Sequence, residues 1–347
     1  MDWSHSTSLA DYLTSSDVLR SVSAIAVAVR EGGRWKWAGR SEVGSIRDDT
    51  TFDLASLTKP LMATLAVELD REGRFSLDCP VRDLWPDAPT LATAGDLLRH
   101  RSGLVAWLPF YSLCAAGRSR SRSGPEFRRD CVFDVLEGAE QWSVPGRLYS
   151  DLGYLLWGVL AERALGEDLR QIWSSSSTAH SELGYGPGLD HRPSPIGTAQ
   201  EVLLGEGLGV ALEDLGPPRG GEPQDGNARF LGPTAHAGLF GSIRALSEWL
   251  EATWVAPTEA LRRSGIEDLD RPEAGGHWFR PALASSCGSS VSAVSFGHTG
   301  FVGGAVWIDP MEGRAAVCLA NRRSPTDSIR DSRRRLFTDV LSPQAGW

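Results

Sequence analysis

Strand-like segments occur at both ends of this 347-residue chain, whereas its middle alternates helical segments with loops rich in glycine, proline and serine. Residues 22–29 form a β-branched and alanine-rich run, and residues 34–38 follow Gly32-Gly33 as the returning strand of a hairpin. Near the C-terminus, short strand-like runs separated by turn residues span residues 289–297, 304–309 and 315–321. Strands at both ends with helices between them predict that the two termini join one sheet and that the middle forms a second lobe.

The predicted fold class is α/β (α+β), with an antiparallel sheet from both termini flanked by helices, plus a mostly helical lobe. We place the sheet-containing lobe at about residues 1–75 and 235–347, and the helical lobe at about residues 76–234, within one domain of residues 1–347. A chain of this length provides ample material for a buried core. Helical periodicity is found at residues 9–19, 94–100, 133–138, 152–164, 243–254 and 328–341.

Lysine is almost absent from the chain: of 35 basic residues, only Lys36 and Lys59 are lysines and the rest are arginines. Lys59 lies three positions after Ser56, at the start of a predicted helix that carries leucines at 61, 65 and 69 and ends near Gly73. Residues at i and i+3 share a helix face, so the Ser56 and Lys59 side chains can meet. A partly buried lysine can lose its proton, whereas an arginine effectively never does. Lys59 is therefore a candidate to accept the proton that turns Ser56 into a nucleophile.

Two further segments follow Ser56-Leu-Thr-Lys59 in the chain: Tyr149-Ser150-Asp151, and His298-Thr299-Gly300 followed by Phe301. With these segments in order, the sequence resembles the serine penicillin-recognising hydrolases, specifically the class C β-lactamase, DD-peptidase and esterase branch. Members of that branch carry Ser-x-x-Lys, Tyr-x-Asn and Lys/His-Thr-Gly, and three motifs in order are far more specific than one. Other stretches similar to the branch are residues 97–104, 225–229 and 236–240.

The resemblance implies a β-lactamase/transpeptidase-like fold that forms a single catalytic domain. It assigns Ser56 as the nucleophile that becomes acylated, with Lys59 and Tyr149 sharing the general-base work. It places His298-Thr299-Gly300 on the strand that edges the cleft, and it builds the oxyanion hole from the backbone N–H groups of Ser56 and Phe301. Which of Lys59 and Tyr149 is the base stays open, although a cationic lysine beside the tyrosine would favour its phenolate.

The sequence departs from the branch at two positions. Asp151 stands where the branch has asparagine, and an ionised carboxylate only accepts hydrogen bonds, whereas an amide also donates them. The change weakens the docking of a substrate amide and leaves Asp151 either to hold Lys59 charged or to accept from a substrate ammonium. His298 stands where lactamases often carry lysine, and a partly charged imidazole holds a substrate carboxylate less firmly. The candidate substrate-binding and oxyanion residues are Asp151, His298, Thr299, Gly300 and Phe301.

We therefore expect a serine hydrolase that forms an acyl-enzyme on Ser56 and hydrolyses carboxylic esters or small amide or D-amino-acid-containing substrates. β-Lactamase or DD-peptidase activity as the main role is one alternative. A non-catalytic protein that binds an acyl or peptidyl ligand on the same fold is another. A small-molecule substrate is the expected partner, no cofactor is expected, and the sequence leaves the oligomeric state open.

Several of these residues also have structural interpretations. Tyr149 could be a packed aromatic before a helix, with Asp151 as the N-cap, and His298 could be a hydrogen-bonded structural histidine. His100 and His236 belong to none of the three motifs, so we expect both to be structural. The histidines do not approach metal-ligand spacing with a carboxylate on one helix face, so no metal site is expected.

Composition limits the remaining classes. The formal net charge of −9 provides no basic surplus to neutralise phosphates, which argues against a nucleic-acid binder. Arginines crowd residues 118–129, which we expect to form a solvated loop, with an anion site or a partner surface as alternatives. No run approaches about 18 apolar residues, and the N-terminus has neither a basic nor an apolar signal region. We therefore expect a cytoplasmic protein without a membrane span.

The five cysteines are scattered, odd in number and free of CxxC spacing, so they predict neither a disulfide framework nor a zinc site. Cys287 and Cys318 lie among apolar or small residues, and we expect both to be buried thiols. The remaining three are Cys79, Cys114 and Cys131.

Overall fold

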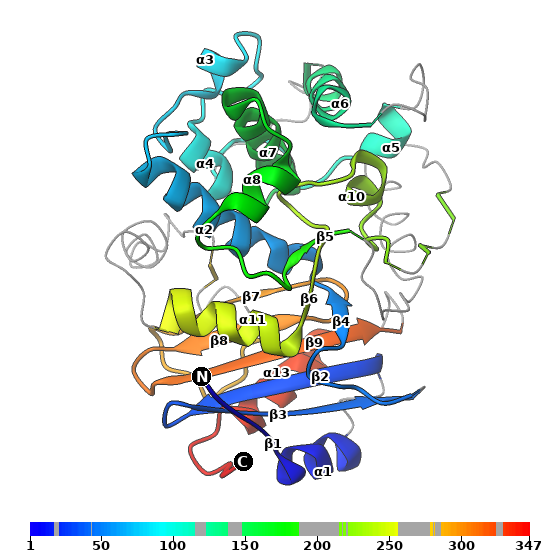
Figure 1. The fold of residues 1–347 in the computed structure, drawn as a ribbon, viewed down its shortest axis with the longest axis vertical. Coiled ribbons are helices and arrows are strands. Elements are labelled where there is room, and N and C mark those ends of the chain that lie inside the picture. Colours follow the sequence, from blue (N-terminus) through cyan, green and yellow to red (C-terminus); the bar gives the residue numbers. More distant parts are fainter. Residues whose placement is uncertain are drawn as a thin grey trace.

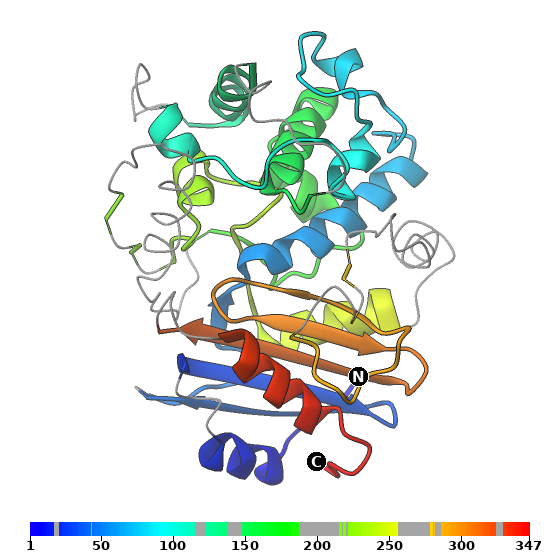
Figure 2. The same ribbon diagram turned by 180° about the vertical axis from the view of Figure 1, so that it is seen from behind.

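The architecture is seen in a computed structural model of the chain (Figures 1 and 2). The structure describes residues 1–16, 21–42, 44–114, 123–137, 148–186, 215–216, 218–219, 221–255, 278–279, 281, 286–323 and 329–347. Figure 1 shows the long strands and both chain termini in one half of the molecule and most of the helices in the other. Within the described ranges, no helix is long and apolar enough to cross a membrane.

Six strands form the larger sheet, in the order β1-β3-β2-β9-β8-β7. They are β1 (Asp2–His5), β2 (Val22–Glu31), β3 (Arg34–Ser41), β7 (Phe296–Thr299), β8 (Ala305–Asp309) and β9 (Arg314–Arg322). The predicted hairpin is β2–β3, and β2 pairs with β9 in antiparallel register, with Ala26 opposite Leu319. The prediction that both termini build one sheet is thus confirmed. The prediction of a purely antiparallel sheet is wrong in one detail, because β1 runs parallel to β3 and the sheet is therefore mixed. The long connection between β1 and β3 makes this parallel pairing possible.

The strand predicted at residues 289–297 is mostly wrong, because among these residues only the last two belong to β7. Ser292 explains the difference. Its backbone N–H and its hydroxyl both donate to the Asp309 carboxylate, at 2.6 and 2.7 Å. Such side-chain hydrogen bonds offer the backbone an alternative to the sheet ladder.

Helices cover both faces of this sheet. α11 (Ile243–Leu250) lies on one face, and α1 (Thr7–Ser15) and α13 (Ile329–Val340) lie on the other (Figures 1 and 2). Along β2, Ala26 belongs to the core that includes α11, whereas Val27 belongs to the core shared with α1 and α13. Burial on both faces explains why β2 is almost continuously apolar.

Two buried helices form the centre of the helical half. α2 (Thr58–Arg71) is buried from residue 58 to 69, and α7 (Asp151–Leu165) is buried from residue 152 to 162. Figure 1 shows α2 starting beside the sheets and running into the helical half. The helical half also contains α3 (Val81–Leu84), α4 (Ala94–Leu98), α5 (Phe110–Leu113), α6 (Pro125–Glu137), α8 (Leu169–Ser175) and α10 (Gly226–Leu231). The π-helical turn η4 (Glu251–Val255) directly follows α11.

A small antiparallel sheet connects the two halves and brings distant segments to the start of α2. Its strands are β4 (Thr51–Asp53), β6 (Leu239–Ser242) and β5 (Gly184–Tyr185), in the order β4-β6-β5. The Leu54 N–H continues the pairing by donating to the Leu239 carbonyl at 3.0 Å. The residues after β4 therefore lie against the residues before β6.

Cysteine pairing differs from the expectation at one place, because Cys114 and Cys131 form a disulfide with Cα atoms 5.7 Å apart. Cys114 follows α5 and Cys131 lies within α6, so the bond depends on how two helices meet and not on a spacing motif. Cys287 and Cys318 are buried free thiols, as predicted.

The loop predicted at residues 118–129 is wrong from residue 125 onward, where α6 begins. Residues 115–122 lie outside the described ranges. Within α6, Phe127 and Arg128 are buried rather than solvated. Arg128 of this run therefore contributes to the interior of the helical half.

Candidate active site

Ser56 and Lys59 meet where the small sheet gives way to α2. The short 3₁₀ helix η2 (Ala55–Leu57) carries Ser56 and leads directly into α2, so both side chains share one face. Lys59 Nζ lies 2.9 Å from Ser56 Oγ. The Lys59 side chain is fully buried, whereas Ser56 is half-buried and therefore reachable from solvent. The structure thus brings together the serine and the lysine that the sequence singled out.

Asp53 holds the turn before Ser56 in an unusual conformation. Ala55 has a φ of 46°, in the left-handed region that residues other than glycine rarely adopt. The buried Asp53 carboxylate accepts from the backbone N–H groups of Ala55 and Gln224, both at 2.8 Å. These bonds fix the turn and connect it to the segment that carries Asp225. Burial raises the pKa of Asp53 to about 6, and the two backbone hydrogen bonds offset only part of that effect.

This raised pKa predicts a pH-dependent stability. The neutral form of Asp53 is favoured in the folded protein, so its contribution is present below an unfolded pKa of about 4 and is lost as the pH rises through about 6. As the pH rises from about 4 to about 7, the free energy of unfolding of the wild type should therefore fall by about 2 kcal/mol through Asp53 alone. Asp53→Asn has no carboxyl to titrate at this position, so it should not show this decrease. Urea unfolding at several pH values measures the difference. Parallel pH profiles for the two proteins would contradict the prediction.

Four oxygen atoms surround the Lys59 nitrogen. Asp151 Oδ1 lies 2.7 Å from it and the main-chain oxygen of His236 lies 2.9 Å from it, in addition to Ser56 Oγ. The Tyr149 hydroxyl is hydrogen-bonded to both Lys59 and Ser56, and Lys59 Nζ lies 5.2 Å from the centre of the tyrosine ring. Three residues proposed from the sequence, Ser56, Tyr149 and Asp151, thus surround the nitrogen of the fourth, Lys59.

Burial and the neighbouring charges shift the pKa of Lys59 in opposite directions. Burial disfavours the Lys59 ammonium, but the Asp151 carboxylate and the Tyr149 oxygen outweigh it, so the pKa of Lys59 lies above its ordinary value. Burial raises the pKa of Tyr149 as well; Lys59 opposes this effect and Asp151 adds to it. Lys59 thus acts on Tyr149 in the expected direction, toward the phenolate, but burial outweighs it and the pKa of Tyr149 lies above its ordinary value.

The start of α7 positions Tyr149 and Asp151. The N-cap is Ser150 rather than Asp151, because the Ser150 hydroxyl oxygen accepts from the backbone N–H of Gly153 at 3.3 Å. The backbone N–H of Ser150 donates to His100 Nδ1 at 3.0 Å, and the His100 ring lies 4.5 Å from that of Tyr149. Ser150 is therefore fixed from both sides, and the two residues next to it are held in place.

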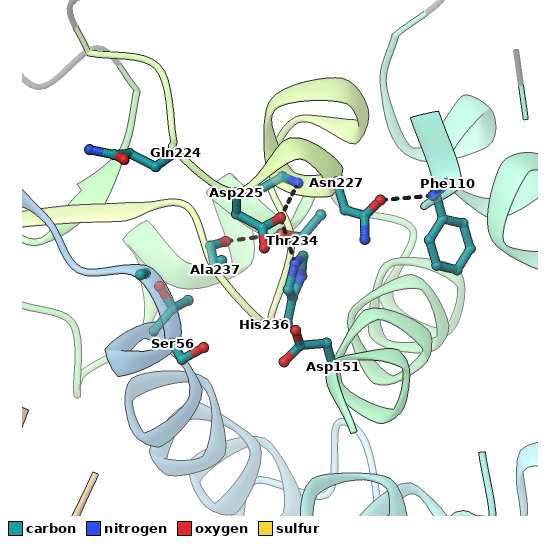
Figure 3. Close-up of polar contacts among 12 residues, drawn as sticks. Ser56, Phe110, Asp151, Gln224, Asp225, Asn227, Thr234, His236 and Ala237 are labelled. Atoms are coloured by element: carbon teal, nitrogen blue, oxygen red, sulfur yellow. Dashed lines mark hydrogen bonds and ion pairs between the residues drawn. The ribbon is translucent and has the colours of Figure 1, made fainter. Parts of the chain in front are cut away.

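A second buried pair, to which the sequence analysis assigned no catalytic role, lies near Asp151 (Figure 3). His236 Nε2 lies 2.9 Å from Asp225 Oδ1, and that oxygen also accepts from the backbone N–H of Ala228 at 2.7 Å. Burial opposes the charge of Asp225, but His236 and its other partners hold the pKa of this carboxyl below its ordinary value. Because the His236 carbonyl accepts from Lys59, the pair fixes one wall of the lysine site. The only signal for it in the sequence was the similarity of residues 225–229 and 236–240 to the branch.

Asp151, Asp225 and His236 are the described residues whose spacing could hold a metal ion, since they offer ligand atoms within 4.8 Å of one another. One histidine and two carboxylates form a donor set that zinc accepts. However, the Lys59 ammonium already lies 2.7 Å from Asp151. A divalent cation among these residues would be repelled by Lys59 at short range, so the arrangement suits the lysine better than a metal.

The end of β7 comes close to the turn before Ser56. A Cβ atom on Gly300 would lie 3.0 Å from the Leu54 carbonyl oxygen, so the absence of a side chain allows this approach. Thr299 and Phe301, on either side of Gly300, are half-buried. The third motif therefore presents backbone and partly accessible side chains next to Ser56.

His298 behaves differently from the other residues of its motif. Its side chain is fully buried, its ring stacks on Phe279 with centroids 4.7 Å apart, and Nδ1 lies 3.0 Å from the Thr299 carbonyl oxygen. Its ring also lies 6.2 Å from that of Tyr149. The structure thus places the imidazole in the interior, next to the catalytic tyrosine candidate, and not at the surface of the site.

Comparison with known proteins agrees with this fold. A family model described as "Beta-lactamase" matches residues 16–339. The chain is 28% identical to "Esterase EstB" of Burkholderia gladioli, over 87% of this chain and 86% of that protein. Two solved structures are similar at a TM-score of 0.64. One is a beta-lactamase/D-alanine carboxypeptidase from Yersinia pestis (16% identity, 97% of this chain and 100% of that one), and the other is EstCE1, "a hydrolase with promiscuous acyltransferase activity" (18% identity, 94% and 98%).

Fold and family together define a serine hydrolase. The chain belongs to the beta-lactamase family, among its class C β-lactamase, DD-carboxypeptidase and esterase relatives. The resemblance drawn from the three motifs is confirmed. So is the expected β-lactamase/transpeptidase-like fold, and the solved structures support that fold alone because their identities are low.

Proposed function

We propose that this protein hydrolyses carboxylic esters, or small amide or D-amino-acid-type substrates, through an acyl-enzyme on Ser56. One observation carries the proposal: the half-buried Ser56 hydroxyl lies 2.9 Å from the buried Lys59 nitrogen and is hydrogen-bonded to Tyr149. A nucleophile within hydrogen-bond reach of a base, which is in turn held by a third group, is the arrangement that acyl transfer needs.

In the proposed reaction, Ser56 Oγ forms a bond to the substrate carbonyl carbon while its proton passes to the Lys59–Tyr149 pair. The backbone N–H groups of Ser56 and Phe301 stabilise the oxyanion, a role supported by the close approach of Gly300 to Leu54. The carbon–oxygen bond of the ester then breaks, and the leaving oxygen receives the proton. A water molecule attacks the acyl-enzyme in the same way, which releases the acid and restores the Ser56 hydroxyl.

Two features favour neutral ester substrates over carboxylate-bearing β-lactams. Lys59 and His298, the basic residues of the three motifs, are both fully buried, so neither offers an exposed charge to a substrate carboxylate. Asp151, in the position of the usual asparagine, is engaged by Lys59 and has no amide N–H to donate to a substrate carbonyl. The similarity to a protein named as an esterase supports the same choice.

An activity panel tests this function. We expect the purified protein to hydrolyse nitrophenyl acyl esters faster than nitrocefin and to be labelled by a fluorophosphonate probe. Ser56→Ala should abolish both hydrolysis and labelling, because it removes the proposed nucleophile. Ser174→Ala, at an exposed serine outside the site, is the matched control and should leave both unchanged.

Other outcomes of the panel decide between the alternatives. Nitrocefin turnover that exceeds ester turnover would favour β-lactamase as the main role. A folded wild type that neither reacts with the probe nor hydrolyses any substrate would favour a non-catalytic binding protein and overturn the proposal.

A further inference from the structure

Lys59 is built into the site as a donor. An ammonium carries three protons and no acceptor, whereas a neutral amine carries two protons and a lone pair. The nitrogen faces four oxygen atoms, contributed by Ser56, Tyr149, Asp151 and the His236 main chain. The Asp151 carboxylate and the His236 carbonyl can only accept from Lys59, and Asp151 also places a negative charge 2.7 Å from Nζ. This contact favours the charged form of Lys59.

We propose that Asp151 is a positioning residue that holds Lys59 as a permanent ammonium, which leaves Tyr149 to take the proton of Ser56. This inference rests on the proposed function. Its main observation is a carboxylate where the branch carries a neutral amide, with Oδ1 2.7 Å from Lys59 Nζ. The lysine side chain is 0% exposed and the aspartate side chain 17% exposed, so water screens the pair weakly. The sequence left open whether Asp151 serves Lys59 or a substrate ammonium, and this contact favours Lys59.

The charges around Lys59 support the same assignment. Asp151, Tyr149 and Tyr154 face it from α7, and Asp225 and His236 face it from the segment before β6. Asp225 is paired with His236, and the His236 carbonyl accepts from Lys59. Two carboxylates, one buried and one partly buried, thus stabilise the ammonium, and the raised pKa of Lys59 agrees with this balance.

The consequence is a relay through a neutral tyrosine. Ser56 Oγ accepts a hydrogen bond from the Lys59 ammonium, so the Ser56 proton is free to point at the Tyr149 oxygen. As Oγ bonds to the carbonyl carbon, its proton moves to the Tyr149 oxygen and the phenolic proton moves to the leaving oxygen of the ester. The carbonyl carbon–oxygen bond breaks, the alcohol departs, and Tyr149 is again a phenol. Lys59 keeps its three protons throughout.

The scarcity of lysine makes the charge of Lys59 directly measurable. Protein grown with lysine labelled at Nζ and Cε gives only two lysine signals by NMR, and Lys36→Arg identifies which belongs to Lys59. We expect the Lys59 signal to remain that of an ammonium from about pH 6 to about pH 9. In Asp151→Asn its titration midpoint should fall by about one pH unit or more, a tenfold change in the ammonium-to-amine ratio. A neutral Lys59 at pH 7 in the wild type, or an unchanged midpoint in the variant, would overturn the inference.

The pH dependence of ester hydrolysis provides a second readout that a purely structural role would not move. The alkaline limb of the kcat/KM profile should shift to lower pH in Asp151→Asn, in step with the NMR midpoint. Asp87→Asn, which removes an exposed carboxylate elsewhere, should leave the limb in place. If Ser56-dependent hydrolysis occurs but Lys59 titrates near neutrality, the inference alone fails. If Lys59 is an ammonium but Ser56 is never acylated, the proposed function fails instead.

Discussion

Replacing Lys59 by methionine is expected to lower kcat/KM for a nitrophenyl ester by about 10³-fold, within the range that general acid–base groups supply. Methionine fills most of the same space but has neither charge nor donor, so the hydroxyls of Ser56 and Tyr149 lose the cation that orients them. Steady-state hydrolysis and the rate of fluorophosphonate labelling measure the loss. The decrease should appear equally in kcat and kcat/KM, because the interaction serves the transition state and not substrate binding.

Two variants separate this chemical effect from a loss of folding. Lys36→Met removes the only other lysine, which lies on β3 and contacts the Trp347 carbonyl, and should leave the activity unchanged. Adding Asp151→Asn to Lys59→Met removes the carboxylate that has lost its partner, so thermal stability should return. Activity that returned together with stability would show that Lys59 only neutralises Asp151, and would contradict its role in orienting the hydroxyls of Ser56 and Tyr149.

The sequence predicts the local part of this site and misses the part that depends on packing. Ser56 and Lys59 are three residues apart on one helix, so their contact follows from helix geometry alone. Tyr149 and the β7 motif are distant in the chain, and only the family resemblance linked them to Ser56. The pKa shifts of Lys59 and Tyr149 could not be predicted from the sequence, because they depend on the burial of both side chains and on the contact with Asp151.

The fold shows the same division. Apolar runs and turn residues predict β2, β3, β8 and β9, because the strands of a buried sheet are themselves rich in apolar residues. β1 has no such apolar pattern, since three of its four residues are exposed. β1 lies beside β3, and Trp3 stacks on Trp37 with ring centroids 6.3 Å apart. No local sequence pattern connects these two segments, so the contact could not be predicted from the sequence. The Cys114–Cys131 bond likewise depends on where α5 and α6 meet.

Arg128→Met is expected to lower the free energy of unfolding by about 3–5 kcal/mol, because it breaks a buried ion pair by removing one partner. Arg128 and Glu162 are each 3% exposed and form two hydrogen bonds, and Arg128 also reaches Asp168 at 2.6 Å. These contacts join α6, α7 and the start of α8. Without Arg128, the Glu162 carboxylate stays buried and unpaired or takes up a proton. Urea unfolding measures the loss, which should be larger at about pH 8 than at about pH 5, since burial raises the pKa of Glu162.

A double variant distinguishes the cost of an unpaired charge from the cost of lost packing. Arg128→Met combined with Glu162→Met removes both charges and should recover most of the stability, because an apolar pair of similar volume avoids the desolvation of two ions. If the double variant were as unstable as the single one, the ion pair would matter through its shape and not its charge. Glu162 lies about three turns along α7 from Tyr149 and Asp151. Loss of the pair should therefore reduce the fraction of folded protein while leaving the ester hydrolysis of each folded molecule unchanged.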